Sequence, residues 1–177
     1  MVSRIAHGLI VAAMTLATAG TAVAQASSTN EVATKTDWSV FEDSNPKECW
    51  AVAAPKETVN TREGRIVSVK RSDILLMAFY RPGSGVQGQL AFTGGYNFAS
   101  GVPVTINIDG AEFNLFTQGE WAWTNSAADD AKIITAMKRG RSATVTGLSQ
   151  RSRTTTKDTF SLSGFTAAIE EAQARCK

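Results

Sequence analysis

VPVTINIDGAEFNLF, which spans Val102–Phe116, decides the fold class of this 177-residue chain. Apolar and polar residues alternate on both sides of Asp109-Gly110, as they do in strands that bury one face. An Asp-Gly pair supplies the positive φ angles of a two-residue hairpin turn. The stretch therefore predicts an antiparallel hairpin. Pro103 has no N–H to donate, which places that end of the hairpin at a sheet edge or bulge.

Further short strands, separated by turn residues, are predicted on both sides of this hairpin. They are expected at Trp38–Phe41, Cys49–Ala53, Ile66–Lys70, Ile74–Tyr80, Val86–Thr93, Ser142–Leu148 and Thr159–Leu162. A polar, basic segment, 150–156, separates the last two strands. The pattern predicts an all-β domain.

Two helices are predicted in the C-terminal half, one internal and one at the C-terminus. Ser126 with Asp129 three residues later fits a capping box, and Gly140 after two basic residues fits the end of that helix. The second helix is expected at Phe165–Arg175, where apolar residues recur every three or four positions. The same spacing places Cys176 on the buried side of the helix.

The N-terminus predicts export. An apolar stretch, Leu9–Ala17, follows Arg4, and Ala22-Val23-Ala24 fits the small-x-small pattern of signal peptidase. We therefore expect a signal peptide over 1–24, a flexible leader over 25–36 and one domain over 37–177. The mature protein is expected in the periplasm, or secreted or on the outer surface, with no transmembrane segment because no apolar run is long enough.

Two cysteines, Cys49 and Cys176, remain in the mature chain. In an exported protein such a pair predicts a structural disulfide, and with two cysteines the connectivity is fixed. No Cys-x-x-Cys spacing points to redox chemistry. The expected bridge fastens the last helix to the strand that carries Cys49.

Several function classes are disfavoured by composition. The only histidine is His7, inside the predicted signal, so histidine-based nucleophilic catalysis and His-ligated zinc are excluded from the mature chain. We expect no metal, no cofactor and no enzymatic activity. The chain has 18 basic and 16 acidic residues, and a near-neutral balance argues against a dedicated nucleic-acid binder.

Candidate binding residues fall into two groups. Trp121 and Trp123 share one face of an extended segment, so they either pack in the core or form a stacking platform for a sugar or peptide. The second group is the one local concentration of basic residues, which is either a solvated rim or a contact with an anionic envelope or host-surface polymer. Its candidate members are Arg139, Arg141, Arg151 and Arg153.

The order of these elements resembles the invasion-associated locus B family of exported Gram-negative bacterial proteins. The likeness is carried by Asp37-Trp38-Ser39-Val40, Cys49-Trp50 with Pro55-Lys56, the hairpin of 104–116, and the segment FSLSGFTAAI at 160–169. The resemblance implies a β-sandwich in the periplasm or at the outer surface, linked in some pathogens to host-cell entry. It supplies no catalytic residues.

Two functions are weighed on this basis. The first is an exported, non-enzymatic envelope protein that binds or stabilises a cell-envelope or host-surface component. The alternative is an envelope glycan hydrolase, which would need two Asp or Glu side chains facing a cleft. The sequence leaves the ligand and the oligomeric state open.

Overall fold

The structure is a computed structural model that describes residues 30–177. The predicted signal peptide and the first residues of the predicted leader lie outside the described residues. Neither helix of the described part has the length and apolar composition needed to cross a bilayer.

All strands of the described part belong to one antiparallel sheet of twelve strands, ordered β1-β2-β3-β6-β7-β10-β9-β8-β11-β12-β4-β5. The strands are β1 Glu31–Lys35, β2 Trp38–Ser44, β3 Lys47–Ala53, β4 Glu57–Arg62, β5 Arg65–Ile66, β6 Leu75–Arg81, β7 Val86–Thr93, β8 Val104–Ile108, β9 Ala111–Gln118, β10 Trp121–Trp123, β11 Ser142–Leu148 and β12 Thr155–Ser161. The predicted hairpin is β8–β9, with positive φ at both Asp109 and Gly110.

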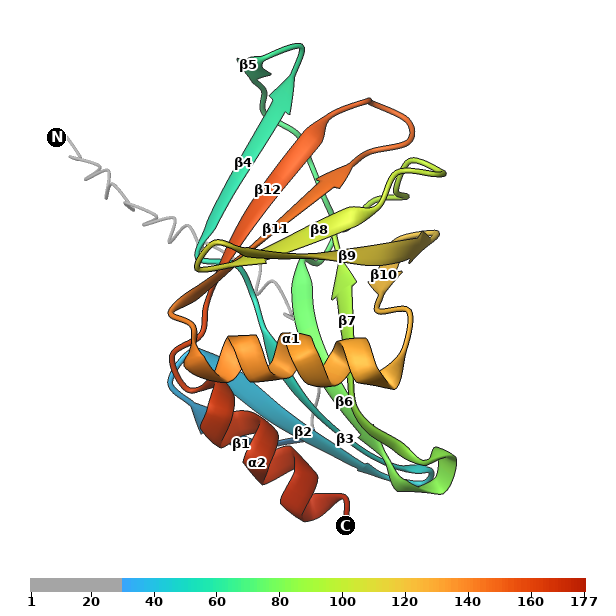
Figure 1. The fold of residues 1–177 in the computed structure, drawn as a ribbon, viewed down its shortest axis with the longest axis vertical. Coiled ribbons are helices and arrows are strands. Elements are labelled where there is room, and N and C mark those ends of the chain that lie inside the picture. Colours follow the sequence, from blue (N-terminus) through green and yellow to red (C-terminus); the bar gives the residue numbers. More distant parts are fainter. Residues whose placement is uncertain (1–29) are drawn as a thin grey trace, which may run out of the picture.

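The sheet corrects the expectation of a β-sandwich. A sandwich would have two separate sheets, whereas here β10 pairs with both β7 and β9 and so joins the two halves into one sheet that does not close. Figure 1 shows the two halves, β2, β3, β6 and β7 below and β4, β12, β11 and β8 above. The two architectures share the same alternation of apolar residues along each strand, so the pattern alone could not separate them.

The main core lies on the inner face of this bent sheet. Phe92 of β7 contacts Phe160 of β12 edge to face, with ring centroids 6.1 Å apart, so the two halves pack against each other. Trp38 is fully buried beside Phe165, and its indole N–H donates to the Ser161 carbonyl over 2.9 Å. The β-rich fold is therefore held by one contiguous apolar core.

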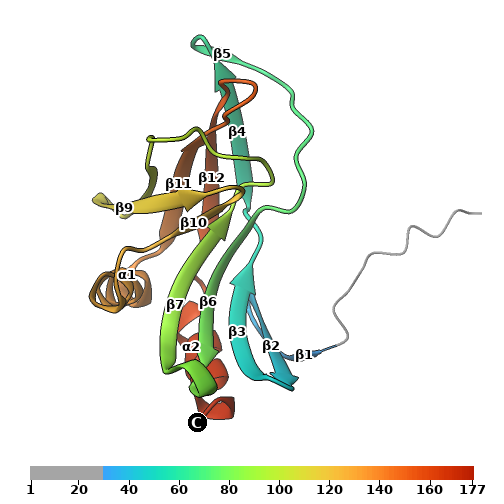
Figure 2. The ribbon, with the colours of Figure 1, turned by 90° about the vertical axis from the view of Figure 1, so that its right-hand side faces the viewer.

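Both helices cover the lower half of the sheet (Figures 1 and 2). Helix α1, Ala127–Arg139, begins at the predicted cap, where the Ser126 hydroxyl accepts from the Asp129 N–H. Helix α2, Phe165–Arg175, lies over β2 and β3. The predicted disulfide Cys49–Cys176 joins α2 to β3.

Some elements differ locally from the predicted ones, and β12 begins at Thr155, four residues before its predicted start. The predicted leader contains β1, which pairs with β2 from Glu31 to Lys35. Strand β4 was missed because its sequence, ETVNTR, carries one apolar residue, Val59. The strand predicted at Ile66–Lys70 is limited to β5, and residues 67–74 instead form a connector between β5 and β6.

Candidate functional site

The leading candidate site is a pocket of about 450 Å³ at the upper end of the sheet. Three segments line it: the connector 67–74, the loop after β7, and the β11–β12 turn with the start of β12. Its lining residues are Val69, Lys70, Arg71, Tyr96, Asn97, Ser149, Gln150, Arg151, Ser152, Thr154 and Thr156. The volume lies within the range of small-ligand pockets.

The pocket exists because the inner face of β12 changes from apolar to polar along the strand. Phe160 is in the core, whereas Asp158, Thr156 and Thr154 follow at inward positions and are all buried. Strand β4 pairs beside them and places Thr58 opposite Asp158. An apolar core cannot extend over this surface, so a hydrogen-bonded network takes its place.

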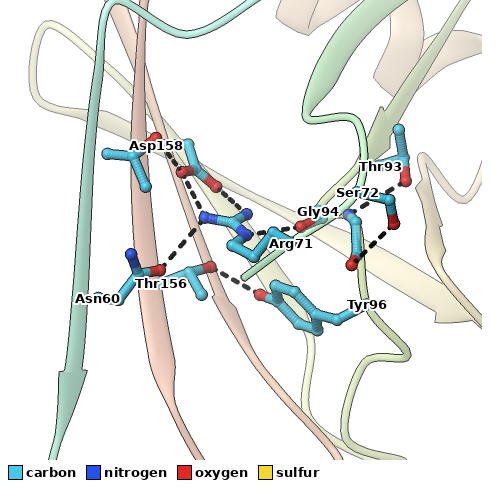
Figure 3. Close-up of polar contacts among 10 residues, drawn as sticks. Asn60, Arg71, Ser72, Thr93, Gly94, Tyr96, Thr156 and Asp158 are labelled. Carbon is cyan, nitrogen blue, oxygen red and sulfur yellow. Dashed lines mark hydrogen bonds and ion pairs between the residues drawn. The ribbon is translucent and has the colours of Figure 1, made fainter. Parts of the chain in front are cut away.

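Arg71 and Asp158 form the centre of that network (Figure 3). The Arg71 guanidinium donates to both carboxylate oxygens of Asp158, over 2.8 and 2.6 Å, and the two side chains are 6% and 0% exposed. Arg71 also donates to the Gly94 carbonyl over 2.7 Å and to the Asn60 side chain over 3.3 Å. The ion pair therefore ties the connector to β4, β12 and the end of β7.

Tyr96 completes the floor of the pocket. Its hydroxyl lies 2.6 Å from that of Thr156, and the Arg71 guanidinium sits over its ring, 5.1 Å from the centroid. Phe98 contacts the ring edge to face at 5.0 Å. Burial raises the pKa of the Tyr96 phenol above its ordinary value. These contacts leave the floor with its polar groups already satisfied.

The mouth of the pocket differs from its floor. Lys70, Asn97, Gln150 and Arg151 are exposed, and in the described part of the chain none of their side chains makes a hydrogen bond or an ion pair. Two of the four carry a positive charge. The lining holds no carboxylate, and the described residues contain no cluster of acidic, Cys or His side chains suited to a metal. Such an arrangement suits the binding of an anion.

The structure separates the predicted arginines into two pairs. Arg139 ends α1 and Arg141 precedes β11, whereas Arg151 and Arg153 lie in the turn that follows β11. Seven strand residues lie between the pairs, or roughly 20 Å. Arg151 lines the pocket, and Arg153 lies in the same turn with its N–H bonded to the Ser149 carbonyl.

The two predicted tryptophans lie on the outer face of the sheet. Trp121 is 37% exposed, Trp123 is half-buried, and their rings stack with centroids 5.6 Å apart. Trp123 packs on a second, smaller apolar cluster around Met77, Phe79 and Ala91. Neither ring belongs to the main core.

Comparisons with known proteins agree with this architecture. The family model described as "Invasion associated locus B (IalB) protein" matches residues 38–173. The chain belongs to the invasion associated locus B family. The matched range includes every residue that lines the pocket.

A solved structure supports the fold. The chain is similar to the crystal structure of invasion associated protein B from Bartonella henselae, with a TM-score of 0.53 and 13% identity over 80% of this chain and 95% of that one. At this identity the likeness concerns the fold. Among curated proteins, no match to the chain was found.

Sequence reasoning missed the floor of the pocket. The sequence predicts Lys70 at the end of a strand. It does not indicate that Arg71, Tyr96 or Asp158 belongs to a binding site. Arg71 and Asp158 are 87 residues apart, so no local pattern connects them. One signal was available: Asp158 shares the inward register of Phe160, and a charge at such a position requires a partner.

Proposed function

We propose that this family member is an exported, non-enzymatic binding protein of the cell envelope, and that the pocket holds an anionic component of the envelope or of a host surface. One observation carries the proposal. Lys70 and Arg151 reach the mouth of the pocket from two different segments, and neither has an acidic partner among residues 30–177. Two unpaired cations beside a cavity attract a negative group.

The rigid floor supports binding as well. Because Arg71, Tyr96 and Thr156 already bond to protein groups, the cavity keeps its shape without a ligand. A preformed site loses less conformational entropy when it binds. Export is supported by the N-terminal sequence and is compatible with the Cys49–Cys176 disulfide.

The same pocket favours binding over glycan hydrolysis. A glycosidase places two carboxyl groups on either side of the scissile bond. Among residues 30–177, the lining contains no carboxylate, and the carboxylate of the network beneath it, Asp158, is fully buried and bonded to Arg71. It is therefore poorly suited to act as an acid or a nucleophile.

The test compares two double variants that remove the same charge. Lys70→Ala with Arg151→Ala removes the cations at the pocket, and Arg139→Ala with Arg141→Ala removes two at the other end of β11. Heparin serves as the anionic probe, titrated at 50, 150 and 500 mM NaCl. We expect the pocket variant to bind about tenfold more weakly, equal to about 1.4 kcal/mol for the two contacts.

The control variant should bind like the parent, and both variants should unfold at the parental temperature because exposed charges contribute little to stability. Binding by the parent should weaken as salt shortens the Debye length. If the two double variants lose equal affinity, or if the parent does not bind at any salt concentration, the proposal fails.

A further inference from the structure

We infer that the site takes an acidic polysaccharide, with a charged sugar in the pocket and another sugar of the same polysaccharide on the ring of Trp121. The inference rests on the proposed function. It adds that the ligand is a polymer that extends from the pocket toward Trp121. Its basis is the short path of backbone contacts between Arg151 and Trp121.

That path begins inside the pocket. The Gln150 N–H donates to the Asn97 carbonyl over 2.9 Å, which joins the β11–β12 turn to the loop after β7. The next residue, Phe98, donates its N–H to the Gly119 carbonyl over 2.9 Å, which joins the same loop to the β9–β10 turn. Trp121 follows Gly119 by two residues. The Cα atoms of Asn97 and Trp121 are therefore at most roughly 14 Å apart.

Figure 2 shows the same arrangement, with the β9–β10 end of the sheet between the β11–β12 turn above and β7 below. A ligand that leaves the pocket past Asn97 thus meets the β9–β10 turn, and beyond this turn it reaches Trp121 on the outer face of the sheet. The pocket volume of about 450 Å³ holds one segment of a polymer, and the rest of the chain must lie on the surface beyond it.

The Trp121 ring is available for stacking. Trp123 covers one side of it, and within residues 30–177 no other aromatic ring contacts Trp121. Trp123 is anchored in the outer apolar cluster and so holds the Trp121 ring in place. A fixed and partly exposed indole offers an apolar face to a sugar ring while its rim stays in water.

The polar side chains at the mouth also fit a sugar. The side-chain amides of Asn97 and Gln150 each offer donors and an acceptor, and within the described residues these side chains make no hydrogen bond. Hydroxyl groups of a saccharide need both kinds of partner, whereas an inorganic anion needs donors only. Lys70 and Arg151 then bind the acidic group of the same sugar.

The experiment measures affinity against chain length. The probes are glucuronate, hyaluronan and heparin fragments of two and six sugars, and maltohexaose as a neutral hexasaccharide, each titrated calorimetrically with the full mature chain. We expect the acidic hexasaccharide of at least one series to bind at least about tenfold tighter than glucuronate, because it also reaches Trp121. Maltohexaose should bind more weakly than that hexasaccharide.

Trp121→Ala should weaken binding of that hexasaccharide about three- to tenfold and leave glucuronate unchanged. Trp121→Phe should restore most of the loss. Phe116→Ala is the matched control, since Phe116 is an exposed aromatic, 44% accessible, that pairs with Trp123 on the same face. It should have no effect.

The inference is overturned if affinity does not rise with length in either acidic series, or if Trp121→Ala and Phe116→Ala behave alike. In that case a loss of heparin binding in the Lys70→Ala, Arg151→Ala variant would still support the anion-binding pocket. If that loss is also missing, the proposed function fails together with the inference.

Discussion

Arg71 is the residue at which the connector, the loop after β7 and the β4–β12 pair meet. Its guanidinium makes four hydrogen bonds to three partners and covers the Tyr96 ring. A charge this deeply buried is stable only while its partner remains, because desolvation costs several kcal/mol per ion. The pair thus fixes the floor of the pocket.

Asp158→Ala should destabilise the protein by about 3–5 kcal/mol, because it leaves the buried Arg71 charge without its carboxylate. The double variant Arg71→Met with Asp158→Leu should lose less than this, since it removes both charges at once. Urea unfolding of the parent and both variants measures the difference. If the single and double variants lose equal free energy of unfolding, the attraction between Arg71 and Asp158 exceeds the cost of burying both charges. That result would contradict this expectation.

Among single residues, the sequence predicts the roles of those whose interaction partners are close to them in the chain. The Ser126 cap and the Asp109-Gly110 turn were predicted because their signals lie within four residues. Local charge density made Arg151 a candidate binding residue, and the structure places it in the pocket lining, whereas binding itself stays a prediction. The Arg71–Asp158 pair depends on the order of strands across the sheet, which no window of sequence contains.

Helix α2 is the element with the densest set of ion pairs. Arg175 bonds to Glu42 of β2 over 3.1 Å and to Glu171 of its own helix over 2.8 Å, and Lys35 of β1 reaches Glu171 over 3.2 Å. Lys47 also pairs with Glu42. The helix is therefore attached to both N-terminal strands.

These contacts give α2 docking a pH dependence. Lys47 and then Arg175 lower the pKa of Glu42, and Lys35 and then Arg175 lower that of Glu171. Folded-state pKa values below the unfolded ones contribute stability above the ordinary Glu pKa of about 4.3, and this contribution is lost as pH falls through the folded values. We expect the melting temperature to be flat from pH 7 to 5 and to fall below about pH 4.3.

Arg175→Gln is the control for this effect. It should lower the melting temperature at pH 7 and make the decline below pH 4.3 shallower than in the parent. Differential scanning calorimetry across that range gives both values. A variant whose curve stays parallel to the parental one would assign the acid sensitivity to other carboxylates.

Elements were predicted well where their inner faces are apolar. The limits of α2 and β11 match the predicted ones, because their apolar periods are regular. Strand β4 was missed because its inner face carries Thr58, Asn60 and Arg62, which bond to the polar network of β12 and Arg71. The element that sequence patterns missed thus lies beside the candidate site.

At the scale of the whole molecule, the disulfide closes a covalent loop that includes most of the described residues, since 127 positions separate Cys49 from Cys176. Replacing both cysteines by Ala should lower the free energy of unfolding by about 2–5 kcal/mol. Urea unfolding measures the change, and mass spectrometry of the unreduced parent checks the bond. Free thiols in the parent, or a loss below about 1 kcal/mol, would contradict this expectation.

The overall topology was predicted only in part. Alternating strands indicated an all-β fold with two helices, and both features are confirmed. The division into two sheets was wrong because β10, which has three residues, carries the connection between the halves. The alternation of Trp121 and Trp123 predicts an extended segment there, but so short a strand does not indicate which strands it pairs with.

The first and last residues matched by the family model, 38 and 173, have a practical consequence. Strand β1 precedes residue 38, and Cys176 follows residue 173. A recombinant fragment cut at those limits keeps the residues that line the pocket, but it loses β1 and the disulfide that joins α2 to β3. The edge of β2 would then offer unpaired backbone groups to other molecules, a common origin of aggregation. Expression of this protein should therefore begin before Glu31 and extend to Lys177.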